Sequence, residues 1–191
     1  MLTAVNNNGN ALEYVSEALR NDKEIVLPAV NNKGLAVRYA SKDCQDQEVL
    51  LAAAKNDPYI LIEYFKELLN NKEIVLAAIK NHGMAIKNDE FKQFYNDKEV
   101  MLAAVKNYPY AIKYASETLL NDKEIILTTI QATKKSRWHV EKILQYASKE
   151  LCNNKEIVLA ALKCNSDNLA YVSEELCSDK EVVLAAINSK K

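Results

Sequence analysis

The chain has 191 residues, of which 49% are hydrophobic and 27% charged. Its 3 glycines and 3 prolines are too few for a disordered chain or a turn-rich β-sandwich, so composition favours a helical protein. The 25 Lys and Arg against 26 Asp and Glu give a formal net charge of −1. This balance argues against nucleic acid as a partner, because binding to a phosphate backbone favours basic proteins.

The N-terminal sequence and the cysteines indicate a compartment. The first ten residues, MLTAVNNNGN, lack the basic start and apolar stretch of a secretory signal, and no window approaches the roughly 18 apolar residues of a spanning helix. We therefore expect a cytoplasmic protein with no membrane segment. Cys44, Cys152, Cys164 and Cys177 form no C-x-x-C pair, and the two histidines lie far apart, so we expect free thiols, no metal and no cofactor.

A segment resembling I-V-L-A-A-V recurs along the chain. Its leucine stands at eight positions separated by 24 to 26 residues, with one spacing of 32: Leu2, Leu27, Leu51, Leu76, Leu102, Leu127, Leu159 and Leu184. Between these copies runs a second element, A-L-x-Y-A-S-E, clearest at Ala11 to Glu17, Ala36 to Lys42, Ala111 to Glu117 and Asn168 to Glu174. The chain is therefore built from tandem repeats of about 25 residues.

The first element predicts a buried helix. It begins with N-x-x-E, as in Asn21 to Glu24, which is the pattern of a capping box. Residues 25 to 30 are apolar on every side, which a helix tolerates only with neighbours on most of its faces. We therefore expect the repeat leucines to be fully buried: Leu27, Leu51, Leu76, Leu102, Leu127 and Leu159.

The stop signal stands seven residues after the repeat leucine. It is glycine at Gly9, Gly34 and Gly83 and proline at Pro58 and Pro109, which predicts a left-handed closing residue or a helix break. An amphipathic second helix then follows, with Leu12, Val15 and Leu19 on one stripe.

These patterns predict an all-α chain: an α-solenoid of about seven helix-turn-helix repeats of about 25 residues plus a terminal helix. A closed bundle of the same hairpins is disfavoured, because it requires different neighbours at different positions. We expect a single repeat domain over 1–191, with units at about 1–20, 21–44, 45–69, 70–95, 96–120, 121–152 and 153–177 and a terminal helix at 178–188.

The string N-D-K-E-[VI]-[VI]-L-A-A-[VI]-K-N-x-[GP]-x-A-[LI]-x-Y-A-S-E-x-L resembles the tandem repeat of domain-of-unknown-function family 4116, over nearly the whole chain. The resemblance implies a helical-repeat protein without a catalytic motif, and it transfers no site residues to this sequence.

Three recurring polar or aromatic columns are candidate sites. The K-E pair, as at Lys23 and Glu24, suggests repeated acid–base groups, but capping explains the glutamate. A tyrosine column can stack bases or grip a peptide, but half-buried packing with the hydroxyl at the rim is the ordinary role of tyrosine between helices and is the interpretation we prefer: Tyr14, Tyr39, Tyr64, Tyr114, Tyr146 and Tyr171. An asparagine column can hold an extended ligand backbone or satisfy the local backbone: Asn7, Asn32, Asn56, Asn81 and Asn107.

The spacing from repeat leucine to column tyrosine is 12 or 13 residues elsewhere but 19 from Leu127 to Tyr146, so this insertion lengthens a helix. It contains Lys134, Lys135, Arg137, Trp138 and His139, which are candidate anchors for an acidic partner surface. Tyr59, Tyr108 and Tyr110 beside the turn prolines are further candidate contacts.

No phosphate-binding, metalloprotease or nucleophile-elbow motif occurs, so we do not expect an enzyme. The sequence predicts a scaffold that binds a protein or peptide; the alternatives are a single-stranded nucleic-acid-binding repeat and a structural segment of a longer array. Met1 aligns within the first buried helix and the last unit lacks a second helix. We therefore expect the exposed terminal helices to self-associate or to fray.

Overall fold

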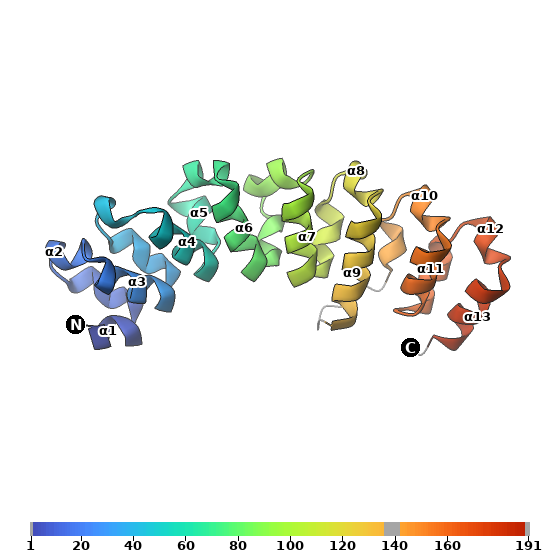
Figure 1. Cartoon of the computed structure of the whole chain (residues 1–191), viewed down its shortest axis with the longest axis horizontal. Coiled ribbons are helices and arrows are strands. Elements are labelled where there is room, and N and C mark those ends of the chain that lie inside the picture. Colours follow the sequence, from blue (N-terminus) through green and yellow to red (C-terminus); the bar gives the residue numbers. More distant parts are fainter. Residues whose placement is uncertain (1, 136–141, 190–191) are drawn as a thin grey trace. The chain divides into compact units, whose positions relative to one another are not determined.

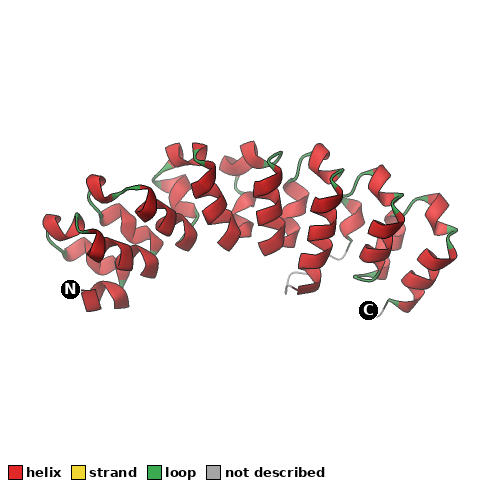
Figure 2. Ribbon diagram, in the orientation of Figure 1, coloured by secondary structure: helices red, strands yellow, loops and turns green. Residues whose placement is uncertain are grey.

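The computed structural model describes residues 2–135 and 142–189, and in this part of the chain every regular element is helical (Figure 2). The predicted all-α class is confirmed. The chain divides into two compact units, residues 1–91 and 92–191, which are described separately below. Helices labelled α are α-helices, and those labelled η are 3₁₀ helices.

Unit 1 contains a long α-helix in each repeat, followed by shorter helical pieces (Figure 1). Its elements are α1 (Leu2–Asn7), η1 (Gly9–Tyr14), α2 (Glu17–Arg20), α3 (Lys23–Asn32), η2 (Gly34–Tyr39), η3 (Lys42–Cys44), α4 (Gln47–Asn56), α5 (Tyr59–Glu63), η4 (Lys66–Asn70), α6 (Lys72–Asn81) and η5 (Gly83–Lys87). The helix η6 (Asp89–Phe94) contains the boundary between the units.

Unit 2 continues the same alternation. Its elements are α7 (Lys98–Asn107), η7 (Pro109–Tyr114), α8 (Glu117–Leu120), α9 (Lys123–Lys135), η8 (Ile143–Gln145), α10 (Lys149–Cys152), α11 (Lys155–Leu162), η9 (Ser166–Tyr171), α12 (Glu174–Cys177) and α13 (Lys180–Asn188).

In each unit the long helices pack side by side in chain order. In unit 1, α3 contacts α1 and α4, and α4 contacts α6. In unit 2, α9 contacts α7 and α11, and α11 contacts α13. The 3₁₀ helices form a second layer, in which η1 contacts η2 and η8 contacts η9. No repeat buries its apolar face alone, so each unit is a stack of repeats of the α-solenoid kind.

The predicted second helix is interrupted. In most repeats it is a 3₁₀ helix of five or six residues followed by a separate short helix, with two extended residues between them. Val15 (ψ 160°) and Ser16 (ψ 158°) form this break in the first repeat. The serine starts a new helical turn in later repeats, where Ser116 and Ser148 accept hydrogen bonds from the backbone N–H three residues on.

The 3₁₀ conformation places every third residue on the buried side. From Gly9 to Val15, around η1, the buried residues are Gly9, Leu12 and Val15. From Pro109 to Ala115, around η7, Pro109, Ile112 and Ala115 are buried at the same spacing, together with the small Ala111. This period of three, rather than 3.6, is a signal in the sequence that indicates a 3₁₀ helix.

The predicted capping residue is wrong by one position. The residue after the predicted asparagine caps each long helix: the Asp22 carboxylate accepts from the N–H of Glu24, and the Asn71 amide oxygen accepts from Glu73 and Ile74. The glutamate is consequently the second helical residue, not the third, and a capping box is not formed.

The glycines are also explained differently. No described residue has a positive φ, so Gly9 and Gly34 do not close helices in the left-handed conformation. An ideal Cβ on Gly9 would instead lie 2.3 Å from the carbonyl oxygen of Ala29 in the next repeat. Glycine is required there because two backbones approach each other closely.

The core of each unit is formed by the residues around the repeat leucine and not by the leucine itself. Ile125, Ile126, Thr129 and Ile130 are at most 1% exposed, whereas Leu127 between them is half-buried. Leu27, Leu51, Leu102 and Leu159 are also half-buried, and only Leu76 is buried, at 8%. The expectation of full burial is therefore wrong except at Leu76: the side chain of Leu27, for example, packs against the core of unit 1 but stays partly exposed.

The insertion lengthens α9, as predicted. This helix has 13 residues, against 10 in α3, α4, α6 and α7. Thr129 and Thr133 are buried on it, and their hydroxyls donate to the carbonyl oxygens of Ile125 and Thr129 one turn earlier. Both buried hydroxyls are therefore satisfied within the helix.

Candidate functional site

One side of every long helix carries the repeat leucine at its centre. The residues four before and four after it lie on the same side, because positions i and i+4 are neighbours on a helix. We call this surface the leucine face. Its central stripes are Lys23, Leu27 and Asn31 on α3, Gln47, Leu51 and Lys55 on α4, Lys72, Leu76 and Lys80 on α6, Lys98, Leu102 and Lys106 on α7, Lys123, Leu127 and Gln131 on α9, and Lys155, Leu159 and Lys163 on α11.

In unit 1 the leucine face forms a groove of about 570 Å³ across α3, α4 and α6. Leu27, Leu51 and Ala52 line its apolar floor, and polar side chains complete its walls: Asn31, Gln47, Glu48, Lys55 and Glu73. The groove therefore offers apolar contact with polar groups on either side.

In unit 2 a groove of about 650 Å³ lies over α7 and α9. Part of its lining stands at the same places in the repeat as residues of the unit 1 groove. Glu124, Leu127, Thr128 and Gln131 correspond to Glu48, Leu51, Ala52 and Lys55. The groove is thus a property of the repeat and not of one local irregularity.

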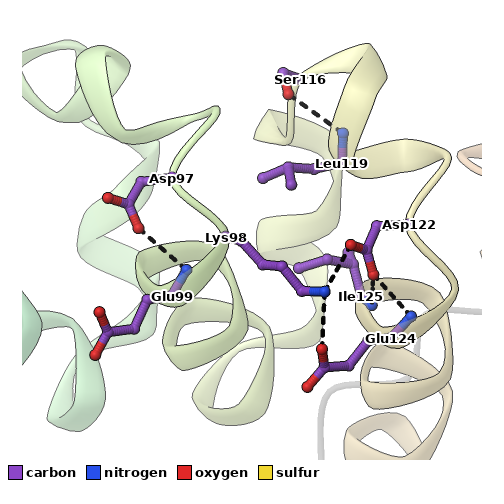
Figure 3. Close-up of polar contacts among 8 residues, drawn as sticks. All are labelled: Asp97, Lys98, Glu99, Ser116, Leu119, Asp122, Glu124 and Ile125. Atoms are coloured by element: carbon purple, nitrogen blue, oxygen red, sulfur yellow. Dashed lines mark hydrogen bonds and ion pairs between the residues drawn. The ribbon is translucent and has the colours of Figure 1, made fainter.

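A ladder of ion pairs closes the edge of the leucine face where the long helices begin. Figure 3 shows one rung, in which Lys98 extends from α7 to the carboxylates of Asp122 and Glu124 on α9. Its Nζ lies 2.7 Å from Asp122 and 2.8 Å from Glu124. Asp122 also caps α9 by accepting from the N–H of Glu124 and of Ile125. The Asp122 carboxylate therefore caps α9 and also forms an ion pair with Lys98 of the preceding long helix, α7.

The same rung recurs in both units. Lys23 bridges Asp46 and Glu48 at 2.6 Å each, and Lys155 bridges Asp179 and Glu181 at 2.8 and 2.9 Å. At the rung after Lys23, Gln47 replaces lysine and its Nε2 donates to Glu73 at 2.6 Å. The glutamate of the K-E pair therefore bonds to the preceding repeat, which corrects the expectation that capping explains it.

These contacts shift the pKa of both partners. The hydrogen bond to Asp46 raises the pKa of Lys23, and Lys23 lowers the pKa of Asp46. Partial burial acts to raise the pKa of Asp122, but hydrogen bonds from Lys98 and from the backbone N–H of Ile125 outweigh it, so this pKa lies below its usual range. The ladder is consequently fully charged near neutral pH.

The asparagine column satisfies backbone groups, but those of the preceding repeat. Asn32 Oδ1 accepts from the N–H of Gly9 and its Nδ2 donates to the carbonyl of Asn6, both in the first repeat. Asn56 makes the same two bonds to Gly34 and to the carbonyl of Asn31. These side chains are occupied, so they do not form a ladder for a ligand.

A further recurring link, between the asparagine before a long helix and the serine that follows the 3₁₀ helix, was missed in the sequence. The Ser116 hydroxyl donates to Oδ1 of Asn96 at 2.6 Å, and its backbone N–H donates to the carbonyl of Tyr95 at 2.9 Å. Ser148 and Asn121 are joined in the same way at 2.5 Å. The recurring N and S at fixed spacing in N-D-K-E and Y-A-S-E are the signal that could have predicted this link.

The tyrosine column lies on the 3₁₀ layer, and its members differ in burial. Tyr39 packs half-buried against the core of unit 1, as expected, whereas Tyr14 is 84% exposed. The guanidinium of Arg38 lies over the Tyr39 ring, 4.5 Å from its centre, and donates to the Tyr64 hydroxyl. In unit 2, Lys113 lies over Tyr114, 4.9 Å from the ring centre.

The residues proposed around the insertion are not brought together by the described structure. Lys134 is exposed on the last turn of α9, Lys135 ends this helix, and Arg137, Trp138 and His139 lie outside the described residues. Tyr59 is 40% exposed at the start of α5 in unit 1. In unit 2, the rings of Tyr108 and Tyr110 contact each other with centroids 5.9 Å apart. Their role in binding stays a prediction.

The cysteines form no disulfide, and the helices at both ends of the described chain expose apolar side chains. All four cysteines are free, and burial raises the pKa of the Cys152 thiol. In the described part no group of three or more His, Cys, Asp or Glu side chains is placed to hold a metal ion. Leu2, Leu184 and Ile187 are 47%, 45% and 72% exposed, and their self-association stays a prediction. None of the described helices has the length and apolar character required to cross a membrane.

The stacked hairpins, the ion-pair ladder and the grooves over it define a helical-repeat scaffold. The family model described as "Domain of unknown function (DUF4116)" matches residues 1–45, 46–88, 97–152, 132–169 and 154–191, so the chain belongs to this family. The resemblance found in the sequence is confirmed. Comparisons with curated proteins and with solved structures find no match to the chain.

Proposed function

We propose that this protein is a non-enzymatic cytoplasmic scaffold that binds a segment of a partner protein on its leucine face. The observation that carries the proposal is the repeat leucine itself. It recurs in every repeat, yet in most repeats its side chain is only partly buried, and Leu51 and Leu127 line grooves at equivalent positions in the two units. Free cysteines accord with a reducing compartment.

The core does not require leucine at this position. The flanking residues fill the space between helices, as Ile74, Val75, Ala78 and Ile79 do around Leu76 at 1% exposure or less. Single exposed apolar side chains are ordinary on a protein surface, but a row of them in a groove is typical of an interaction site. The ladder beside it places the charged groups at the edge and leaves the floor apolar, as in the centre of protein interfaces.

The tyrosine column supports the second candidate function, single-stranded nucleic-acid binding. Arg38 over Tyr39 and Lys113 over Tyr114 pair a cation with an aromatic ring that can stack on a base. The net charge of −1 argues against this candidate.

A displayed library of random dodecapeptides, selected against the full chain, tests the proposal. The variant Leu51→Gln/Leu127→Gln removes apolar contact from both grooves without changing charge, and Tyr14→Arg is the control on the opposite layer. We expect peptides that bind wild type and Tyr14→Arg alike and bind the double variant at least about tenfold more weakly. Thermal unfolding monitored by circular dichroism shows whether the variants are folded.

Failure to enrich any peptide, or peptides that bind the folded double variant as tightly as wild type, would reject the leucine face as the binding site. If the double variant unfolds, Ala52→Gln/Thr128→Gln, which fills the same grooves, replaces it with the same expected result.

A further inference from the structure

We infer that the leucine face of unit 1 binds an extended acidic segment, with an apolar side chain at every third residue and carboxylates toward the C-terminal ends of α4 and α6. This inference rests on the proposed function and specifies the partner's chemistry. Its basis is the difference in charge between the two edges of the groove.

One edge of the groove carries an excess of negative charge. At the N-terminal ends of the long helices, Lys23 is bound by Asp46 and Glu48, and Glu73 accepts from Gln47. Carboxylates of a partner are therefore disfavoured at this edge, because three carboxylates face a single ammonium group there.

The other edge carries unpaired cations. Lys33, Lys55 and Lys80 are exposed at the C-terminal ends of α3, α4 and α6, and no side chain in the described part of the chain pairs with them. Asp57 is the one carboxylate among the three terminal triplets Asn31–Lys33, Lys55–Asp57 and Lys80–His82, and its Oδ1 accepts from the N–H of Tyr59. The edge therefore has an excess of positive charge.

Capping of the helix ends does not require these lysines. Positive side chains near a helix C-terminus usually offset its partial negative charge and bond its last carbonyl groups. Here the carbonyl of Asn31 accepts from Asn56, and that of Lys55 accepts from Asn81 and lies 3.1 Å from His82 Nε2. The ammonium groups of Lys55 and Lys80 are thus free to bind a partner.

The repeat spacing selects an extended chain. Packed helices lie about 8–10 Å apart, and three residues of a polyproline II chain, which make one turn and return the side chain to the same side, span about 9–10 Å. An apolar side chain at every third residue therefore meets the two leucines that line the groove, Leu27 and Leu51, one after the other. The exposed side-chain amide of Asn31 lines the groove and is free to bond the open backbone of such a segment.

Two fluorescent peptides test the inference by anisotropy with the full chain. The acidic probe is (Leu-Pro-Glu)₄ and the basic probe is (Leu-Pro-Lys)₄, which keeps the spacing and reverses the charge. We expect the acidic probe to bind at least about tenfold more tightly, and this preference to shrink as salt is raised. A peptide of the same composition as the acidic probe, with its leucines irregularly spaced, should bind more weakly.

Two charge-reversal variants localise the effect. Lys55→Glu/Lys80→Glu should weaken the acidic probe at least about tenfold and favour the basic one. Lys42→Glu/Lys87→Glu makes the same change of net charge on exposed residues of η3 and η5, and should alter affinity less than about twofold.

Equal binding of the two probes, no binding of either, or unchanged affinity in Lys55→Glu/Lys80→Glu overturns the inference. The proposed function is decided separately by the library and the leucine variants, which are neutral substitutions. A single-stranded oligouridine that displaces the acidic probe and binds more tightly would also overturn it, because the site would then recognise polyanions and not a peptide.

Discussion

The backbone N–H of Gly34 donates a 2.7 Å hydrogen bond to Oδ1 of Asn56, which lies 22 residues later in the chain. The same amide side chain donates from Nδ2 to the carbonyl of Asn31 at 3.0 Å. Asn56 thereby bonds both sides of the turn in the preceding repeat. The backbones of the two repeats lie so close together that a Cβ on Gly34 would be 2.8 Å from the carbonyl oxygen of Ala53.

This close approach predicts that Gly34→Ala destabilises the protein by about 1–3 kcal/mol, as over-packing does. The expected sign is opposite to the usual benefit of alanine over glycine in a helix. Urea unfolding measures the effect, with Lys33→Ala as the exposed neighbouring control. A Gly34→Ala protein as stable as wild type would show that the backbones are not in contact.

The position of the repeat leucine predicts a reversal of the usual order of core substitutions. Ile126→Ala should cost about 2–5 kcal/mol, because this side chain is fully buried. Leu127→Ala should cost less than half as much, since its side chain is already partly in water. Chemical denaturation of both variants measures the difference. Equal costs would mean that the leucine face is covered.

Two substitutions of Asp122 separate its two roles. Asp122→Asn keeps a capping side chain but loses the ion pair with Lys98, so it should cost about 0.2–1 kcal/mol at low salt and less at high salt. Asp122→Ala also loses the cap and should cost about 1 kcal/mol more. Unfolding at two salt concentrations distinguishes them. An Asn variant as damaging as the Ala variant would assign the whole effect to the ion pair.

Acid should weaken the stack. The pKa values of Asp46, Asp122 and Asp179 lie below their usual range, chiefly through bonds from Lys23, Lys98 and Lys155 and from backbone N–H groups. Carboxyls with a lowered folded-state pKa stabilise above the unfolded pKa of about 4, and this contribution disappears as pH falls through the folded values.

Urea unfolding at pH 7 and near pH 3 measures this loss in wild type and in Asp46→Asn/Asp122→Asn/Asp179→Asn. We expect the triple variant to lose less stability between the two pH values. An identical loss in both proteins would contradict a contribution from these three groups.

Removal of a buried side-chain amide in unit 2 should also destabilise the protein. Asn168 is 0% exposed; its Oδ1 accepts from the N–H of Leu144 in the preceding repeat at 3.0 Å. Asn168→Ala should cost about 1–3 kcal/mol, because the Leu144 N–H is left unpaired in the interior. Asp167→Ala, at the exposed neighbouring position, is the control. A small effect at both positions would indicate that water replaces the amide.

The helical class, the period of about 25 residues and the family were all predictable from the sequence, because each depends on local patterns that recur in every copy. Each long helix is predicted by an apolar run, such as Ile74 to Ile79, and by an acidic or amide residue at its start. The longer α9 followed from the wider spacing around Leu127 in the same way.

Which side of each long helix is buried by neighbouring repeats became known from the tertiary structure and could not be predicted from the sequence. The run from Ile125 to Ile130 contains two threonines and four apolar residues and shows no polar side, so periodicity could not distinguish the buried Ile126 from the partly exposed Leu127. The same holds for Lys98 and Gly34, whose partners lie in the next repeat. A contact made more than 20 residues away depends on how the repeats stack, and the stacking follows from close backbone approach and inter-repeat bonds that local propensity does not contain.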